Sequence, residues 1–160
     1  MYITINAVHI ENLPALRFIG KRCECGPEDF IASWDEWFEK GWFDQLEKLG
    51  AAPENANARW GMTAGDEYWI GMLFAPGASA PDGFLYMDRP AAKYAVLGLS
   101  GRRDKDLLGE EGITLVMDEA GKRGWTLSGD GWGLERYNCV QSAASGKMIK
   151  TLVAFMNQID

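Results

Sequence analysis

Apolar and polar positions alternate at the start of the chain in a pattern that predicts two short strands. Over residues 3–10 the alternation places Ile5 on one face and Val8 on the other, and a second strand is expected over residues 16–22 or 23. Pro14 separates the two strands, because proline lacks a backbone donor and restricts the residue before it. We therefore expect two strands with a break at Pro14.

Two longer segments have the period of an amphipathic helix. The first begins near the Gly-Pro-Glu-Asp run at residues 26–29, where an early proline and two acids suit the positive end of a helix dipole. It is weakened at Gly41 and ends at Gly50, while the second is expected over residues 104–123 with Gly124 as its C-cap. The first helix carries an apolar stripe suited to packing on a sheet, made of Phe30, Trp34, Trp37, Phe38, Phe43, Leu46 and Leu49.

The other apolar runs predict strands. Residues 58–62 and 67–75 are expected to form a hairpin, with Trp69 and Leu73 on one face of its second strand. Residues 76–83, rich in Pro and Gly, form the clearest internal boundary. The opposite face of the second hairpin strand would carry Tyr68, Ile70, Met72 and Phe74. Further strands are expected over residues 83–88, 92–99, 132–139 and 148–156.

The chain contains an internal repeat. Residues 13–18 and 89–94 match at an offset that carries Pro14 onto Pro90, an alanine onto an alanine and a phenylalanine onto a tyrosine. Each half, 1–79 and 80–160, then follows the order strand, helix, strand, strand, and one such unit has too little apolar surface to fold alone. We predict a single α+β domain in which duplicated βαββ units form one antiparallel sheet. Two main helices would pack against it, with a ligand pocket at the seam between the halves.

Composition narrows the functional classes. The 160 residues include 16 Lys or Arg and 23 Asp or Glu, and the resulting net charge of −7 repels phosphate backbones and anionic membranes. We expect no direct nucleic-acid binding and no membrane association, because no apolar run approaches a membrane span. Three cysteines and no signal-peptide pattern favour a cytoplasmic protein. Cys23 and Cys25 lack enough further Cys or His ligands, His9 being the single histidine, so we expect no metal and no other cofactor.

One stretch near the C-terminus combines aromatic rings with an acid. Residues 131–138 read Gly-Trp-Gly-Leu-Glu-Arg-Tyr-Asn, and in a strand Glu135 and Tyr137 would point to the same face. A carboxylate among aromatic rings favours a bound cation. The alternative is an ordinary strand glutamate that is solvated or paired with a neighbouring base. The seven Trp, five Tyr and seven Phe exceed what a core of this size requires, which favours an aromatic pocket.

Four short motifs resemble a known family in their order and spacing. They are Leu-Pro-Ala-Leu-Arg at 13–17, Tyr-Trp-Ile-Gly-Met at 68–72, Arg-Pro-Ala-Ala-Lys-Tyr-Ala-Val at 89–96 and Leu-Glu-Arg-Tyr at 134–137. Over nearly its whole length the sequence resembles the GyrI-like small-molecule-binding domain, also found as the effector-binding domain of multidrug-responsive bacterial transcription regulators. Ala92 is a departure, since glycine is usual there.

The resemblance implies a pocket between two βαββ halves in which Glu135 is the acid that binds organic cations. The chain resembles the stand-alone form, without a DNA-binding domain. Its expected partner is a small molecule, by its charge an organic cation, and a homodimer is left open. The candidate ligand-binding residues are Glu135, Tyr137, Trp34, Trp37, Tyr68, Trp69, Tyr94, Trp125 and Trp132.

Three functions follow from these residues. The favoured one is binding of amphipathic cationic or aromatic small molecules, for drug sensing or sequestration. The second is hydrolysis of strained electrophiles, as in some relatives of similar fold, with Glu135 as general base and Tyr137 or Tyr68 as hydrogen-bond donor. The third is a protein-interaction module whose exposed helix-face aromatics mark the interface.

Overall fold

The computed structural model describes residues 4–24, 30–50, 58–100, 110–126, 133–138, 140–141, 148–149 and 152–159. The strands and helices are β1 (Thr4–Leu13), β2 (Leu16–Arg22), α1 (Phe30–Glu39), α2 (Trp42–Glu47), β3 (Ala58–Ala64), β4 (Glu67–Phe74), β5 (Leu85–Arg89), β6 (Ala92–Ser100), α4 (Glu110–Lys122), β7 (Gly133–Asn138), β8 (Val140–Gln141), β9 (Met148–Ile149) and β10 (Leu152–Gln158). β8 and β9 pair with each other, and the other eight strands form one sheet.

The main sheet has a symmetric strand order. It runs β1-β6-β10-β7-β3-β4-β2-β5, with antiparallel pairing throughout. Exchanging the two halves of the chain exchanges β7 with β3, β10 with β4, β6 with β2 and β1 with β5, so the order reads the same from either end. The predicted α+β fold of two repeated units in one antiparallel sheet is confirmed, and the division of the chain at residues 79 and 80 stays a prediction.

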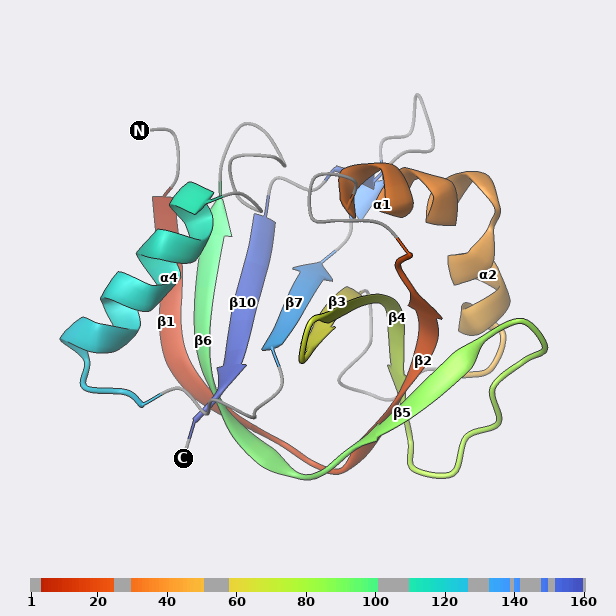
Figure 1. The fold of residues 1–160 in the computed structure, drawn as a ribbon, viewed down its shortest axis with the longest axis horizontal. Coiled ribbons are helices and arrows are strands. Elements are labelled where there is room, and N and C mark those ends of the chain that lie inside the picture. Colours follow the sequence, from red (N-terminus) through yellow and green to blue (C-terminus); the bar gives the residue numbers. More distant parts are fainter. Residues whose placement is uncertain are drawn as a thin grey trace.

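Each half contributes an edge strand to the other half. β1 precedes β2 in the chain but pairs with β6, and β5 precedes β6 but pairs with β2. The chain crosses between halves at Pro14 and Pro90, the two prolines of the sequence repeat, where a missing backbone donor prevents one continuous strand. Figure 1 shows the sheet bent into a U, with β1 and β6 on one side and β2 and β5 on the other. The exchange ties the halves into one unit.

The predicted alternation in β1 is wrong at one point. The register shifts between Ile5 and Ala7, so that one residue of β1 has no partner on β6. Such a β-bulge reverses the alternation beyond it. Ile5 and Val8 therefore both pack against the same core cluster.

The two faces of the sheet carry separate cores. The helix-side core joins the helices to one face, and the opposite core is filled by residues that all lie on strands. In Figure 1, α1 and α2 lie over one arm of the U and α4 over the other. The alternation predicted for β4 is confirmed, because Trp69 and Leu73 lie in the opposite core. The residues predicted for the opposite face of β4 lie in the helix-side core, and they are Tyr68, Ile70, Met72 and Phe74.

The first helical stripe is two helices rather than one weakened helix. Gly41 takes a left-handed conformation with φ of 68° between α1 and α2, which a residue with a side chain adopts only with strain. The turn still carries Trp34, Trp37, Phe43 and Leu46 into the helix-side core, whereas Leu49 is 41% exposed. In the second stripe, α4 spans residues 110–122 and Gly124 has φ of 69°, as expected for its C-cap. Residues 104–109 of that prediction lie outside the described residues.

A bidentate ion pair joins β1 to β7 across two intervening strands. Arg136 donates from Nη1 and Nη2 to the two carboxylate oxygens of Glu11, each at 2.9 Å. These hydrogen bonds, helped by His9, lower the pKa of Glu11 from its ordinary 4.5 to about 2, although burial acts in the opposite direction. The pair stabilises the fold only while Glu11 is ionised.

We expect the Glu11→Gln variant to lower the free energy of unfolding at pH 7 by about 1–2 kcal/mol, after discounting for solvent screening. Because the folded-state pKa is the lower one, the stabilisation is complete above pH 4.5 and is lost as the pH falls toward 2. Urea unfolding from pH 7 to pH 2 should show the two proteins converging at the acidic end. The control is Glu24→Gln, which removes an exposed partner of Arg22. A gap between wild type and Glu11→Gln that does not change with pH would contradict this account.

Candidate ligand-binding site

The middle of the sheet is hollow on its helix side. β7 and β3 pair at the seam between the halves, with Glu135 opposite Gly61 and Gly133 opposite Thr63. Directly paired residues of antiparallel strands share a face, and Gly61 approaches Glu135 on the helix side. The side chains on this part of the face are therefore small or polar, while the regions on either side of it carry the bulky residues of the helix-side core.

Glu135 is held there by two tyrosines. Tyr68 on β4 donates a hydrogen bond from its hydroxyl to Glu135 Oε1 at 2.6 Å, and Tyr137 donates to the same oxygen at 2.8 Å. Trp34 on α1 donates from Nε1 to the Tyr68 hydroxyl at 3.0 Å, and its ring meets that of Tyr137 edge-on at 4.7 Å. The three aromatic residues are at most 5% exposed, whereas Glu135 is half-buried. The aromatic side chains thus fix the carboxylate while leaving it accessible.

The Tyr68 hydroxyl keeps its proton under all ordinary conditions. Burial, and next the negative charge of Glu135, raise the pKa of Tyr68 well above its usual value of 10. Tyr68 therefore acts as a hydrogen-bond donor to the carboxylate and not as a competing anion.

Gly61 makes room for this arrangement. A Cβ atom at Gly61 would overlap the Tyr68 hydroxyl oxygen and lie 2.7 Å from Glu135 Oε1. The hydrogen-bonded pair occupies the space that a side chain on β3 would fill, so the glycine is required by a close approach rather than by backbone conformation.

Glu135 also lines a cleft of about 150 Å³. α4 covers the cleft with Val116 and Met117, the latter 54% exposed, while β3, β7 and β10 form its floor. Besides Glu135, the floor is formed by Thr63, Gly133, Leu134 and Asn157. The cleft thus joins a carboxylate to apolar surface and to two small polar groups, a combination suited to an amphipathic cation.

The structure brings four of the predicted site residues together and separates others from them. Glu135, Tyr137, Tyr68 and Trp34 come together as one hydrogen-bonded group. Trp37 is buried one turn further along α1, where its ring meets those of Trp42, Phe43 and Phe84.

Other predicted residues lie elsewhere. Trp69 and Tyr94 belong to the opposite core, because strand alternation turns their side chains away from the helices. They therefore do not share the cleft with Glu135. Trp125 packs against the helix-side core, with the Arg123 guanidinium 5.7 Å from its ring. Trp132 lies outside the described residues.

The residues of the site that the sequence pattern did not single out include Gly61, Thr63, Met117 and Asn157. A glycine inside a strand pattern is a sign of close approach, so Gly61 could have been found. The other three carry no such signal, because their contribution depends on how α4 and β10 lie against the seam.

Among the described residues, no group of three His, Cys, Asp or Glu side chains could hold a metal ion. No helix in the described part of the chain is long and apolar enough to cross a membrane.

Comparison with known proteins relates this chain to solved structures alone. Neither the protein-family models nor the curated proteins give a match. SAV2435 bound to tetraphenylphosphonium has a TM-score of 0.71 at 13% identity, over 97% of this chain and 94% of that chain. A putative bacterial transcription regulation protein from Staphylococcus aureus MU50 has a TM-score of 0.65 at 12% identity, over 96% and 98%.

EcmrR in its complex with DNA has a TM-score of 0.62 at 10% identity, over 96% of this chain and 57% of that chain. At these identities the likeness establishes the fold. These solved structures thus share the fold that the resemblance implied.

We expect the Gly61→Ala variant to lose about 1–3 kcal/mol of unfolding free energy, because its Cβ collides with the Tyr68–Glu135 pair. Gly133→Ala is the matched control on the neighbouring strand. There the nearest atom to an added Cβ is Thr63 Cβ at 3.6 Å, an ordinary contact, so its stability should change by less than about 1 kcal/mol. Urea unfolding measures both, and equal losses would show that Gly61 has no special role.

Proposed function

We propose that this protein binds amphipathic organic cations at the seam of its sheet, with Glu135 as the counter-charge. The observation that carries the proposal is the half-buried carboxylate beside the cleft, held through Oε1 by Tyr68 and Tyr137. Both tyrosines are neutral donors, so they orient and stabilise the carboxylate without cancelling its charge.

The surroundings favour a cation with an apolar body. Among the residues that the structure describes, Glu135 is the single charged one that lines the cleft. The net charge of −7 raises the local concentration of cations around the protein. Half-burial weakens the solvent screening of the carboxylate, which strengthens its attraction for an incoming positive charge. Val116 and Met117 offer apolar surface on the other side, and methionine adapts to ligands of different shape.

The comparisons support the same class of ligand. A structure of the same fold is described as bound to tetraphenylphosphonium, a lipophilic cation. The seam cleft would hold one ring of such a cation, and the remainder would lie along the exposed side of Met117. Structures described as a transcription regulation protein and as a DNA complex share the fold, which supports a role in sensing or sequestering small molecules. The acidic chain itself would not contact DNA.

The geometry favours the two other functions less. As a hydrolytic base Glu135 would need a second group that donates a hydrogen bond to the substrate, yet both tyrosine hydroxyls already donate to Glu135 Oε1. As an interaction module the protein would need exposed aromatics on its helices, yet Trp34, Trp37 and Phe43 are buried.

We expect tetraphenylphosphonium to quench the tryptophan fluorescence of the wild type in a saturable way. Glu135→Gln keeps the size of the side chain and removes its charge, so its dissociation constant should rise at least about tenfold, equivalent to about 1.4 kcal/mol. Titration of both proteins under identical salt conditions gives the comparison.

The control is Asp118→Asn, which makes the same change in net charge at an exposed position of α4. It should bind the cation within about twofold of the wild type, because exposed charges are screened. Equal affinities of wild type and Glu135→Gln, or no binding by the wild type, would contradict the proposal.

A further inference from the structure

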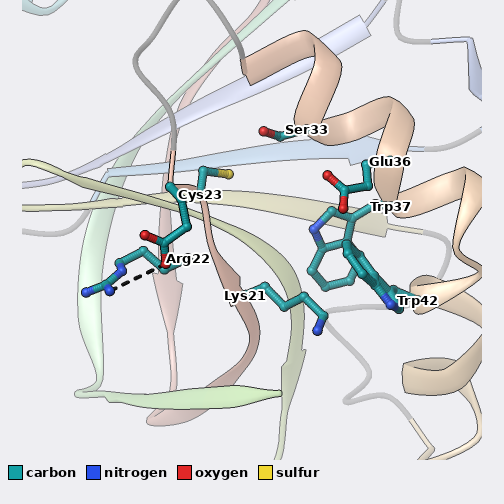
Figure 2. Close-up of a pocket in the computed structure, with 8 residues that line it drawn as sticks. Lys21, Arg22, Cys23, Ser33, Glu36, Trp37 and Trp42 are labelled. Atoms are coloured by element: carbon teal, nitrogen blue, oxygen red, sulfur yellow. Dashed lines mark ion pairs between the residues drawn. The ribbon is translucent and has the colours of Figure 1, made fainter. Parts of the chain in front are cut away.

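A second cleft, of about 340 Å³, shares no residue with the seam cleft. Its lining comes from the end of β2 and the two residues after it, from α1 and from Trp42 of α2. Figure 2 shows Lys21 reaching toward Trp37 and Trp42, with Glu36 of α1 on the far side of these rings. Lys21 thus lies at one end of the cleft, and the indole rings of Trp37 and Trp42 form one of its walls.

The ammonium group of Lys21 sits in an aromatic cage. Nζ lies 4.3 Å from the centre of the Trp42 ring and 4.7 Å from that of Phe84, and it donates a hydrogen bond to the Gly83 carbonyl at 2.8 Å. Both rings are within the range of a cation–π interaction. One cation is therefore bound by two π faces and a carbonyl oxygen.

The cage is built from distant parts of the chain and is fixed independently of Lys21. Trp37 meets the Trp42 ring edge-on at 5.4 Å and the Phe84 ring at 6.0 Å, which holds both rings in place. Trp37 and Phe84 are buried, whereas the long Lys21 side chain is only half-buried. The flexible Lys21 side chain can move into solvent at little cost in free energy, so the rings of the cage would keep their positions without it.

The charges around the cleft favour another cation once Lys21 has left. Arg22 is already paired, with Glu67 at 3.2 Å and Glu24 at 3.6 Å. Glu36 also lines the cleft beside the indole wall. The remaining lining therefore carries more negative than positive charge, next to flat apolar surface.

We propose that the cage of Trp42, Phe84 and the Gly83 carbonyl is a second organic-cation site, which Lys21 occupies in this structure. Its ligand is a small ammonium ion, quaternary or alkylated, whose head replaces the Lys21 ammonium while its apolar part lies along Trp37 in the cleft. The site goes beyond the function proposed for the seam, because it uses neither Glu135 nor its tyrosines.

The test follows the Trp42 indole N–H signal in protein labelled with ¹⁵N-tryptophan, as benzyltrimethylammonium is added. Trp42→Phe identifies this signal among those of the seven tryptophans. In the wild type Lys21 competes with the probe, so Lys21→Met, which keeps the stem and removes the charge, should bind about tenfold more tightly. Lys21→Arg keeps a tethered cation and should stay close to the wild type.

Two further variants make the result decisive. In the Lys21→Met protein, the additional substitution Trp42→Leu should abolish tight binding. Because this protein lacks the Trp42 signal, binding is followed by the signals of the other tryptophans. Glu135→Gln should leave the Trp42 titration unchanged, which separates this site from the seam. Lys21→Gln, also uncharged, replaces Lys21→Met if that variant does not fold. Equal affinities with and without the Lys21 charge, no shift of the Trp42 signal, or loss of that shift in Glu135→Gln would each overturn the proposal.

Discussion

The structure depends on one constraint at its centre, the placement of a carboxylate between two buried tyrosine hydroxyls at the seam of the halves. Tyr68 comes from the first half, while Glu135 and Tyr137 come from the second, and the indole of Trp34 supports Tyr68 from α1. Burying part of a carboxylate is costly unless hydrogen bonds stabilise it. The two strands at the seam make these hydrogen bonds possible, because Gly61 of β3 lies opposite Glu135 of β7 and leaves room for the Tyr68 hydroxyl.

The architecture explains why such a site forms between the halves. Each half lends an edge strand to the other, so neither half completes its part of the sheet alone. The middle pair, β3 and β7, then lies between α1 on one arm of the sheet and α4 on the other (Figure 1), and the cleft above this pair is bordered by Val116 and Met117 of α4. The ion pair of Glu11 with Arg136, two residues far apart in the chain, stabilises β7 from the other face of the sheet.

Much of the fold could be predicted from the sequence, because local patterns reflect local physics. Alternation along β4, the prolines between paired strands and the glycine after α4 each depend on neighbours in the chain. The exchange of β1 and β5 could not be predicted, since pairing across halves leaves no trace in periodicity. The bulge at Ile5 and Ala7 is likewise set by the partner strand. At the site, chemistry identified Glu135 and Tyr137, and alternation put Tyr68 and Trp69 on opposite faces of β4. Only the three-dimensional fold shows which of these faces carries the acid, and brings Asn157 and Met117 to the cleft.

The most direct measurement of the central claim is a crystal structure of the protein with tetraphenylphosphonium. The cation is expected to lie in the seam cleft, with Glu135 as the nearest carboxylate and with the hydrogen bonds from Tyr68 and Tyr137 retained. A cation bound on the opposite face of the sheet, or one whose nearest acid is any residue other than Glu135 when a single molecule is bound, would contradict the central claim.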